Sequence, residues 1–138
     1  MMRDAFGALV DALAYRDLTS TELEQRLARA GFDAEACVDA ITRAAAAGYL
    51  DDARVAVERA HRLGERDASD TAIRAELLRR GVGEELVEAA LEALPPERER
   101  AERLALRLGG GPRAARALAR KGYTEDVVER AVGPDIAQ

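Results

Sequence analysis

The sequence is poor in residues that support redox and nucleophilic chemistry. Its 138 residues include one cysteine, one histidine and no tryptophan. A single cysteine cannot form an internal disulfide, and this favours a reducing compartment, so we predict a cytoplasmic protein. Cys37 falls on an apolar helical pattern, while His61 lies among charged residues. We therefore predict that the protein is not an enzyme and needs no cofactor or metal.

Long hydrophobic runs are also missing. Asp4 and Asp11 interrupt the apolar N-terminal stretch, and no other stretch approaches the roughly 20 apolar residues that a membrane-spanning helix needs. The three glycines at 109–111 are not followed by the Lys-Ser or Lys-Thr pair of a phosphate-binding loop. The sequence thus favours neither secretion, nor membrane insertion, nor a nucleotide site.

What the chain does contain is alanine, leucine and charge. Hydrophobic residues make up 48% and charged residues 34% of the sequence, interleaved at helical spacing. The pattern predicts an all-α protein. The net charge of -5 argues against a protein whose whole surface binds nucleic acid, but it allows a local basic face.

An internal repeat appears when Gly31, Gly81 and Gly122 are superposed. Apolar residues then coincide four and eight positions before each glycine and one position after it: Leu27, Leu77 and Leu118; Leu23, Ile73 and Ala114; Phe32, Val82 and Tyr123. Leu13, Leu63 and Leu104 coincide further upstream. We predict an elongated array of three tandem three-helix repeats, over 1–50, 51–95 and 96–138, with the glycines as C-terminal helix caps.

The helix starts carry their own signals. Thr19 and Glu22 match a capping box, and either Ser69 or Asp70 caps the equivalent helix of the second repeat. The first two repeats lie 50 residues apart and the next two 41, counted at the upstream leucines. The nine extra residues follow Ile41, so we predict a longer third helix in the first repeat.

The joint after that helix reads Gly48, Tyr49, Leu50, Asp51 and Asp52. Two adjacent carboxylates could suggest a metal site or an acid-base pair, but no third carboxylate lies nearby at a suitable spacing. We predict instead that one carboxylate caps the helix that begins at Ala53 and that the other interacts favourably with its dipole. Tyr49 and Leu50 are expected to fill the seam between the first two repeats.

Basic residues concentrate between positions 98 and 121. This segment contains eight basic and two acidic residues, so its net charge is +6. Because the whole chain has a net charge of -5, the rest of the chain carries -11. One interpretation is a solvated face with Arg to Glu pairs along the helix. The other is a surface for an acidic partner or a nucleic-acid backbone. The bases are Arg98, Arg100, Arg103, Arg107, Arg113, Arg116, Arg120 and Lys121.

Three segments together resemble the RecX family, the bacterial regulators of the RecA recombinase. They are "AYRDLTSTELEQRLARAGF" (14–32), "GYLDDARVAV" (48–57) and "IRAELLRRGV" (73–82), the last of which contains Ile73, Arg74, Glu76 and Leu77. The resemblance covers the whole length of the chain, and the second segment is its most specific part. It implies three tandem three-helix repeats and a monomer that binds the RecA filament on DNA, limiting recombination, ATPase and SOS co-protease activity.

Two alternatives remain open. In the family the turn before the Ile-Arg segment is commonly rich in Lys, Gly and Arg, whereas here "ERDASDTA" (65–72) is acidic. The chain could therefore be a helical-repeat adaptor for a different protein. It could also be a DNA-binding helix-turn-helix protein through residues 19–50, although the second helix of that pair carries Asp33, Glu35 and Asp39, which phosphates would repel.

Overall fold

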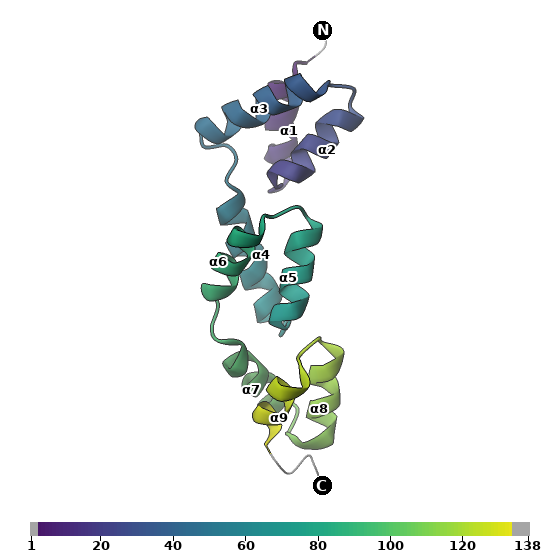
Figure 1. Cartoon of the computed structure of the whole chain (residues 1–138), viewed down its shortest axis with the longest axis vertical. Helices are drawn as coiled ribbons and strands as arrows, with labels where there is room; N and C mark the ends of the chain where they lie inside the picture. The colour runs from purple at the N-terminus through teal and green to yellow at the C-terminus, as the bar shows by residue number, and fades with distance from the viewer. Residues whose placement is uncertain (1–2, 134–138) are drawn as a thin grey trace.

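The computed structural model describes residues 3–133, which form helices and no strand (Figure 1). The all-α prediction is confirmed. The described helices are α1 (Ala5–Tyr15), α2 (Ser20–Arg29), α3 (Ala34–Ala46), α4 (Asp52–Glu65), α5 (Asp70–Arg79), α6 (Glu84–Glu92), α7 (Glu97–Arg107), α8 (Gly111–Arg120) and α9 (Glu125–Val132).

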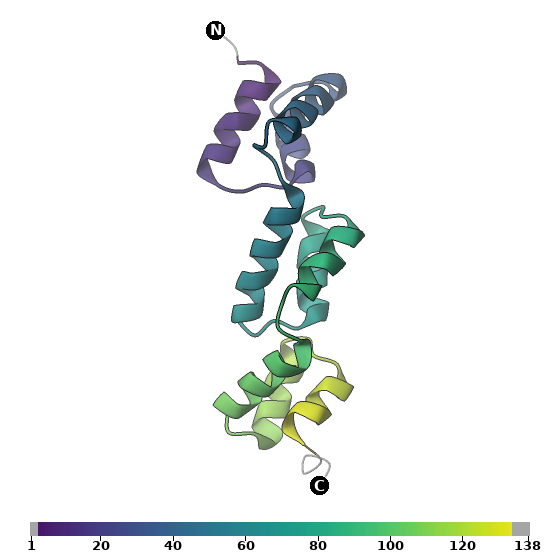
Figure 2. The same ribbon diagram turned by 90° about the vertical axis from the view of Figure 1, so that its left-hand side faces the viewer.

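The helices pack in consecutive groups of three, stacked along the long axis of an elongated molecule (Figures 1 and 2). Helices α1–α3, α4–α6 and α7–α9 each enclose a hydrophobic cluster of their own. The second helices, α2, α5 and α8, lie along one side of the array in Figure 1. We call the contact between the first two groups the first joint, and that between the last two the second joint.

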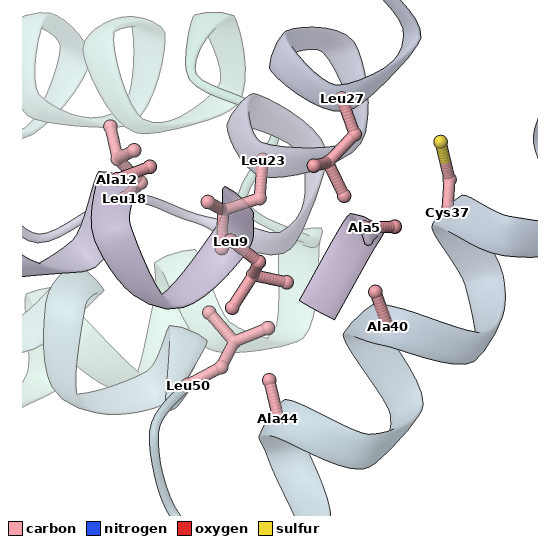
Figure 3. Close-up of a cluster of buried hydrophobic side chains, with 10 residues drawn as sticks. All are labelled: Ala5, Leu9, Ala12, Leu18, Leu23, Leu27, Cys37, Ala40, Ala44 and Leu50. Atoms are coloured by element: carbon pink, nitrogen blue, oxygen red, sulfur yellow. The ribbon is translucent and has the colours of Figure 1, made fainter. Parts of the chain in front are cut away.

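The first cluster illustrates how little surface each group buries. Leu9, Leu23 and Leu27 of α1 and α2 meet the small residues Ala40 and Ala44 of α3 (Figure 3). Burying a leucine contributes about 1.5–3 kcal/mol, so a handful of such residues holds a group together only modestly. Cys37 belongs to this cluster at 2% exposure, which confirms the expected packing role.

Helix ends form where local sequence signals predict them. The Thr19 side chain accepts a hydrogen bond from Glu22 N (3.1 Å), and the Glu22 carboxylate accepts one from Thr19 N (3.0 Å), completing the capping box. Ser69, rather than Asp70, caps α5. Gly31, Gly81 and Gly122 all have positive φ, as C-terminal caps require.

The third helix of the first group is longer than its counterparts. Helix α3 has 13 residues, against nine in α6 and eight in α9. Gly48, at φ +82°, ends the extension and turns the chain towards the next group. The predicted lengthening is therefore confirmed.

Candidate partner-binding surface

The residues that connect α3 to α4 pack against the first helix group. Leu50 is 7% exposed and lies among the side chains of the first cluster (Figure 3). Tyr49 is 54% exposed and contacts the Phe6 ring edge-on at 6.1 Å. The expectation that both fill the seam between groups is wrong, because Tyr49 N bonds back to Ala44 O (2.9 Å) and holds the segment on α3.

The two acids of this joint have different structural roles. Asp51 is the N-cap of α4 and accepts a hydrogen bond from Arg54 N (3.1 Å), as predicted. Asp52 accepts one from Ser20 N at 2.8 Å, a free amide in the first turn of α2. Asp52 therefore links the first two groups, a role that its position in the sequence does not reveal.

The Ile-Arg segment is structural. Ile73 and Leu77 are fully buried in the second cluster. Arg74 forms a two-pronged ion pair with Glu88 of α6 (2.9 and 3.0 Å), and this hydrogen bonding lowers the pKa of that carboxyl. Glu76 pairs with Arg80 along α5 (2.7 Å). Ile73, Arg74 and Leu77 therefore hold α5 on α6.

Arg100 does not belong to the predicted basic surface. Its side chain is 1% exposed and pairs with Asp70 of the preceding group. It also donates to Pro95 O at 2.9 Å. Arg100 lies one turn before the core residue Leu104, and this places it on the inner side of α7. The sequence contains this signal, since the repeat aligns Arg100 with Arg59, a second arginine at a joint.

Two further bases are used within the molecule. Arg107 pairs with Asp67, and Lys121 Nζ donates to Arg66 O (3.1 Å). Both acceptors lie in the acidic turn at 65–72. That turn also provides Asp70 for Arg100, so its carboxylates neutralise bases of the third group.

Tyr123 of the third group also hydrogen-bonds to the acidic turn at 65–72. Its hydroxyl donates to Asp67 O (2.9 Å) and lies 3.3 Å from Ala68 O. The side chain is 5% exposed, and burial raises the pKa of the phenol to about 12. The acidic turn is therefore the docking site for α7–α9, which the sequence did not predict because all its partners in the third group lie at least 27 residues away.

The remaining bases lie on the surface. Arg98 pairs with Glu102 one turn on (2.9 Å), as the solvated-face interpretation expects. Arg103, Arg113, Arg116 and Arg120 are exposed, and in the described residues none of them has an ion pair. Arg113, Arg116 and Arg120 share the side of α8 opposite Ala114 and Leu118. We call these three residues the α8 arginine face.

The described part of the chain contains no cluster of metal-ligating side chains. No group of three His, Cys, Asp or Glu residues there could hold a metal ion. His61 lies on the outer side of α4 beside Glu65 (3.1 Å). Among residues 3–133, every helix is too short or too polar to cross a lipid bilayer.

Sequence comparisons point to one family. The model described as "RecX, first three-helix domain" matches residues 5–43, and "RecX, second three-helix domain" matches 51–91. The chain is 34% identical to the regulatory protein RecX of Trichlorobacter lovleyi over 143 residues, covering 92% of both. It is 33% identical to that of Deinococcus radiodurans over 131 residues, covering 88% of this chain but only 63% of the relative.

Solved structures agree on the fold. The crystal structure of RecX from Lactobacillus salivarius superposes with a TM-score of 0.79 at 19% identity, covering 96% of this chain and 94% of the other. A second crystal structure of a regulatory protein RecX gives 0.76 at 22% identity, covering 92% of this chain and 69% of the other. Both coverages extend beyond the two matched domains and include part of α7–α9.

Proposed function

Because this chain belongs to the RecX family, we propose that it binds the RecA recombinase, in its filament form on DNA, and limits recombination, ATPase and SOS co-protease activity. Its relatives are named regulatory proteins. We propose that it acts by binding alone, without catalysis or a cofactor, as a monomer in the cytoplasm. The single observation that carries the proposal is the family match across both leading helix groups.

We further propose that α7–α9 are a third copy of the same unit, with boundaries at 1–50, 51–95 and 96–138. Two features support this. Gly31, Gly81 and Gly122 occupy the same helix-terminal position in the three groups. Arg59 and Arg100 both reach back to the loop before the second helix of the preceding group, donating to Asp17 O and Ala68 O.

The α8 arginine face, with Arg103, is the proposed contact surface. These side chains are exposed and carry unpaired positive charge on a protein whose net charge is -5. Such a face attracts an acidic protein surface or a phosphate backbone. Arg98 is balanced by Glu102 on α7, and Arg100, Arg107 and Lys121 are excluded by their contacts within the molecule.

The alternatives have less support. The acidic turn at 65–72 suggested an adaptor with a changed partner, but its carboxylates already meet Arg100 and Arg107. Its acidity therefore has an explanation within the fold. For the DNA-binding alternative, α3 would have to enter the major groove, and its exposed residues include Glu35 and Asp39, which phosphates repel.

The proposal predicts that reversing the α8 arginine face weakens inhibition of RecA. We expect the R113E, R116E and R120E triple variant to need at least about tenfold more protein for half-inhibition, because complementary charge is replaced by repulsion. Its free energy of unfolding should change by less than about 1 kcal/mol, since these side chains are exposed. The measurement is RecA ATPase and strand exchange with single-stranded DNA at two salt concentrations.

A matched control reverses three exposed arginines on the other second helices, Arg26, Arg29 and Arg79. This control keeps the net charge of the triple variant but leaves α8 intact, so we expect near-normal inhibition. Equal inhibition by the α8 variant and the unmodified protein would remove this surface from the proposal. No effect of the unmodified protein at any ratio would reject RecA as the partner while leaving the fold assignment unchanged.

A further inference from the structure

A polar groove runs along the first joint, between the end of α1 and helices α4 and α5. Its volume is about 450 Å³, within the range of about 300–1,000 Å³ of ligand sites. Five arginines and two carboxylates line it, a net +3. The lining residues are Arg16, Asp17, Arg59, Arg62, Leu63, Arg66, Glu76 and Arg80. We call this the first-joint groove.

Both carboxylates of the groove already have partners. Asp17 forms a two-pronged contact with Arg54 outside the groove (3.2 and 3.3 Å), and this hydrogen bonding lowers the pKa of the Asp17 carboxyl. Glu76 accepts from Arg80 Nε at 2.7 Å. These acids therefore have little capacity left to balance the other arginines.

Three groove arginines have no such partner. In the part of the chain that the structure describes, the side chains of Arg16, Arg62 and Arg66 form neither an ion pair nor a hydrogen bond. Arg59 is 11% exposed, and its Nη2 donates to Asp17 O at 2.9 Å. Its Nε is buried without any acceptor. The positive charges of these guanidinium groups repel one another, and a bound anion would reduce this repulsion.

The second joint shows how the same positions are neutralised from within. The internal repeat aligns Arg66 with Arg107, Asp17 with Asp67, and Ser20 with Asp70. At the second joint Arg107 pairs with Asp67, and Arg100, the counterpart of Arg59, pairs with Asp70. At the first joint Asp17 pairs with Arg54 instead of Arg66, and Ser20 stands at the position that Asp70 has at the second joint. Glu22 does pair with Arg59 (3.4 Å) and Arg80 (3.2 Å) at the first joint, but among the described residues no carboxylate pairs with Arg66 as Asp67 does with Arg107.

We propose that the first-joint groove is a binding site for a phosphate-bearing anion, held by Arg16, Arg62 and Arg66. The planar guanidinium donates two parallel N–H groups that match phosphate oxygens, so three of them fit an anion with neighbouring phosphoryl groups. The bound phosphate would lie beside Arg66 in the place that Asp67 holds beside Arg107 at the second joint. This site is separate from the α8 arginine face and does not depend on RecA.

The test is a calorimetric titration of the full-length protein in the absence of RecA. The probes are inorganic tripolyphosphate and a single-stranded oligothymidylate, each at matched ionic strength. We expect binding that the R16Q, R62Q and R66Q triple variant weakens by at least about tenfold, because charge-assisted hydrogen bonds are lost. A matched control, R26Q, R29Q and R130Q, removes the same charge from exposed positions of α2 and α9 and should change the dissociation constant less than about twofold.

The two probes separate the possible sources of phosphate. Tripolyphosphate binding that depends on the groove arginines supports the site and identifies a free oligophosphate as sufficient. Oligonucleotide binding alone, with the same dependence, supports the site and identifies a nucleic-acid backbone as its ligand. Absence of binding to either probe, or equal losses in the two triple variants, would overturn the proposal. Circular dichroism confirms that both variants remain folded.

Discussion

At the scale of single residues, Tyr123 couples a joint to pH. Its buried phenol donates to the acidic turn and has a pKa of about 12, above the value near 10 of an exposed tyrosine. The unfolded chain therefore releases this proton first as the pH rises. Stability from this group is complete below pH 10 and is lost as the pH rises from about 10 to about 12.

The corresponding prediction compares the unmodified protein with Y123F. At pH 8 we expect the variant to be less stable by about 1 kcal/mol, because two carbonyls of the turn lose their donor. Between pH 10 and 12 the unmodified protein should lose about 2 kcal/mol relative to Y123F, which carries no titrating hydroxyl. Urea unfolding across this range is the measurement. Parallel stability curves for the two proteins would contradict the assignment.

The burial of Arg100 was not predicted from the sequence. A run of eight bases predicts a basic surface, yet one of them, Arg100, is the largest fully buried side chain among the described residues. Charge counting could not reveal this, because the partner Asp70 lies 30 positions away. By contrast, Cys37 and Leu77 were predicted correctly, since apolar periodicity depends only on neighbours along one helix.

At the scale of elements, the predicted helices are present because their ends depend on local chemistry. The capping box at Thr19 and the glycine at Gly48 act within one turn of the chain. The contacts between groups are not local. Asp52 bonds to Ser20, and Tyr49 stays with the first group, so the sequence predicted the joint but not its partners.

Two of the aligned glycines, Gly31 and Gly81, separate the effect of helix capping from that of packing at a joint. Gly31 and Gly81 both have positive φ, but a Cβ on Gly31 meets no atom within 4 Å, whereas one on Gly81 would lie 2.3 Å from Thr21 Cβ. We expect G31A to cost about 1–2 kcal/mol from backbone strain alone. G81A should cost about 1–3 kcal/mol more, because the first joint must open.

Thermal and urea unfolding of both variants provides the comparison. G31A serves as the control, since the two substitutions impose a similar backbone penalty. Small-angle scattering should detect a change of shape in G81A only, because Thr21 also donates to Gly81 O across this joint (3.1 Å). Equal losses of stability with unchanged scattering would show that the joint tolerates the extra methyl group.

At the scale of the whole molecule, the three groups are joined mainly by polar contacts. Each hydrophobic cluster stays within its own group. The joints rely instead on hydrogen bonds and ion pairs, such as Thr19 Oγ1 to Arg80 O (2.8 Å) and Asp70 N to Glu97 (2.6 Å). We infer that neighbouring groups support each other through these few contacts, in the manner of a repeat array.

This organisation predicts that R100M destabilises the third group selectively. The substitution removes the buried partner of Asp70 but keeps an apolar chain of similar length, and we expect a cost of about 2–3 kcal/mol. Native-state hydrogen exchange should therefore show weaker protection in α7–α9 and unchanged protection in α1–α3, whose core lies two groups away. R98M is the matched control, since its exposed pair with Glu102 is worth only about 0.3–0.5 kcal/mol. A uniform loss of protection across all three groups would instead show that the array unfolds as one cooperative unit, and the polar joints would then transmit stability as fully as a shared core does.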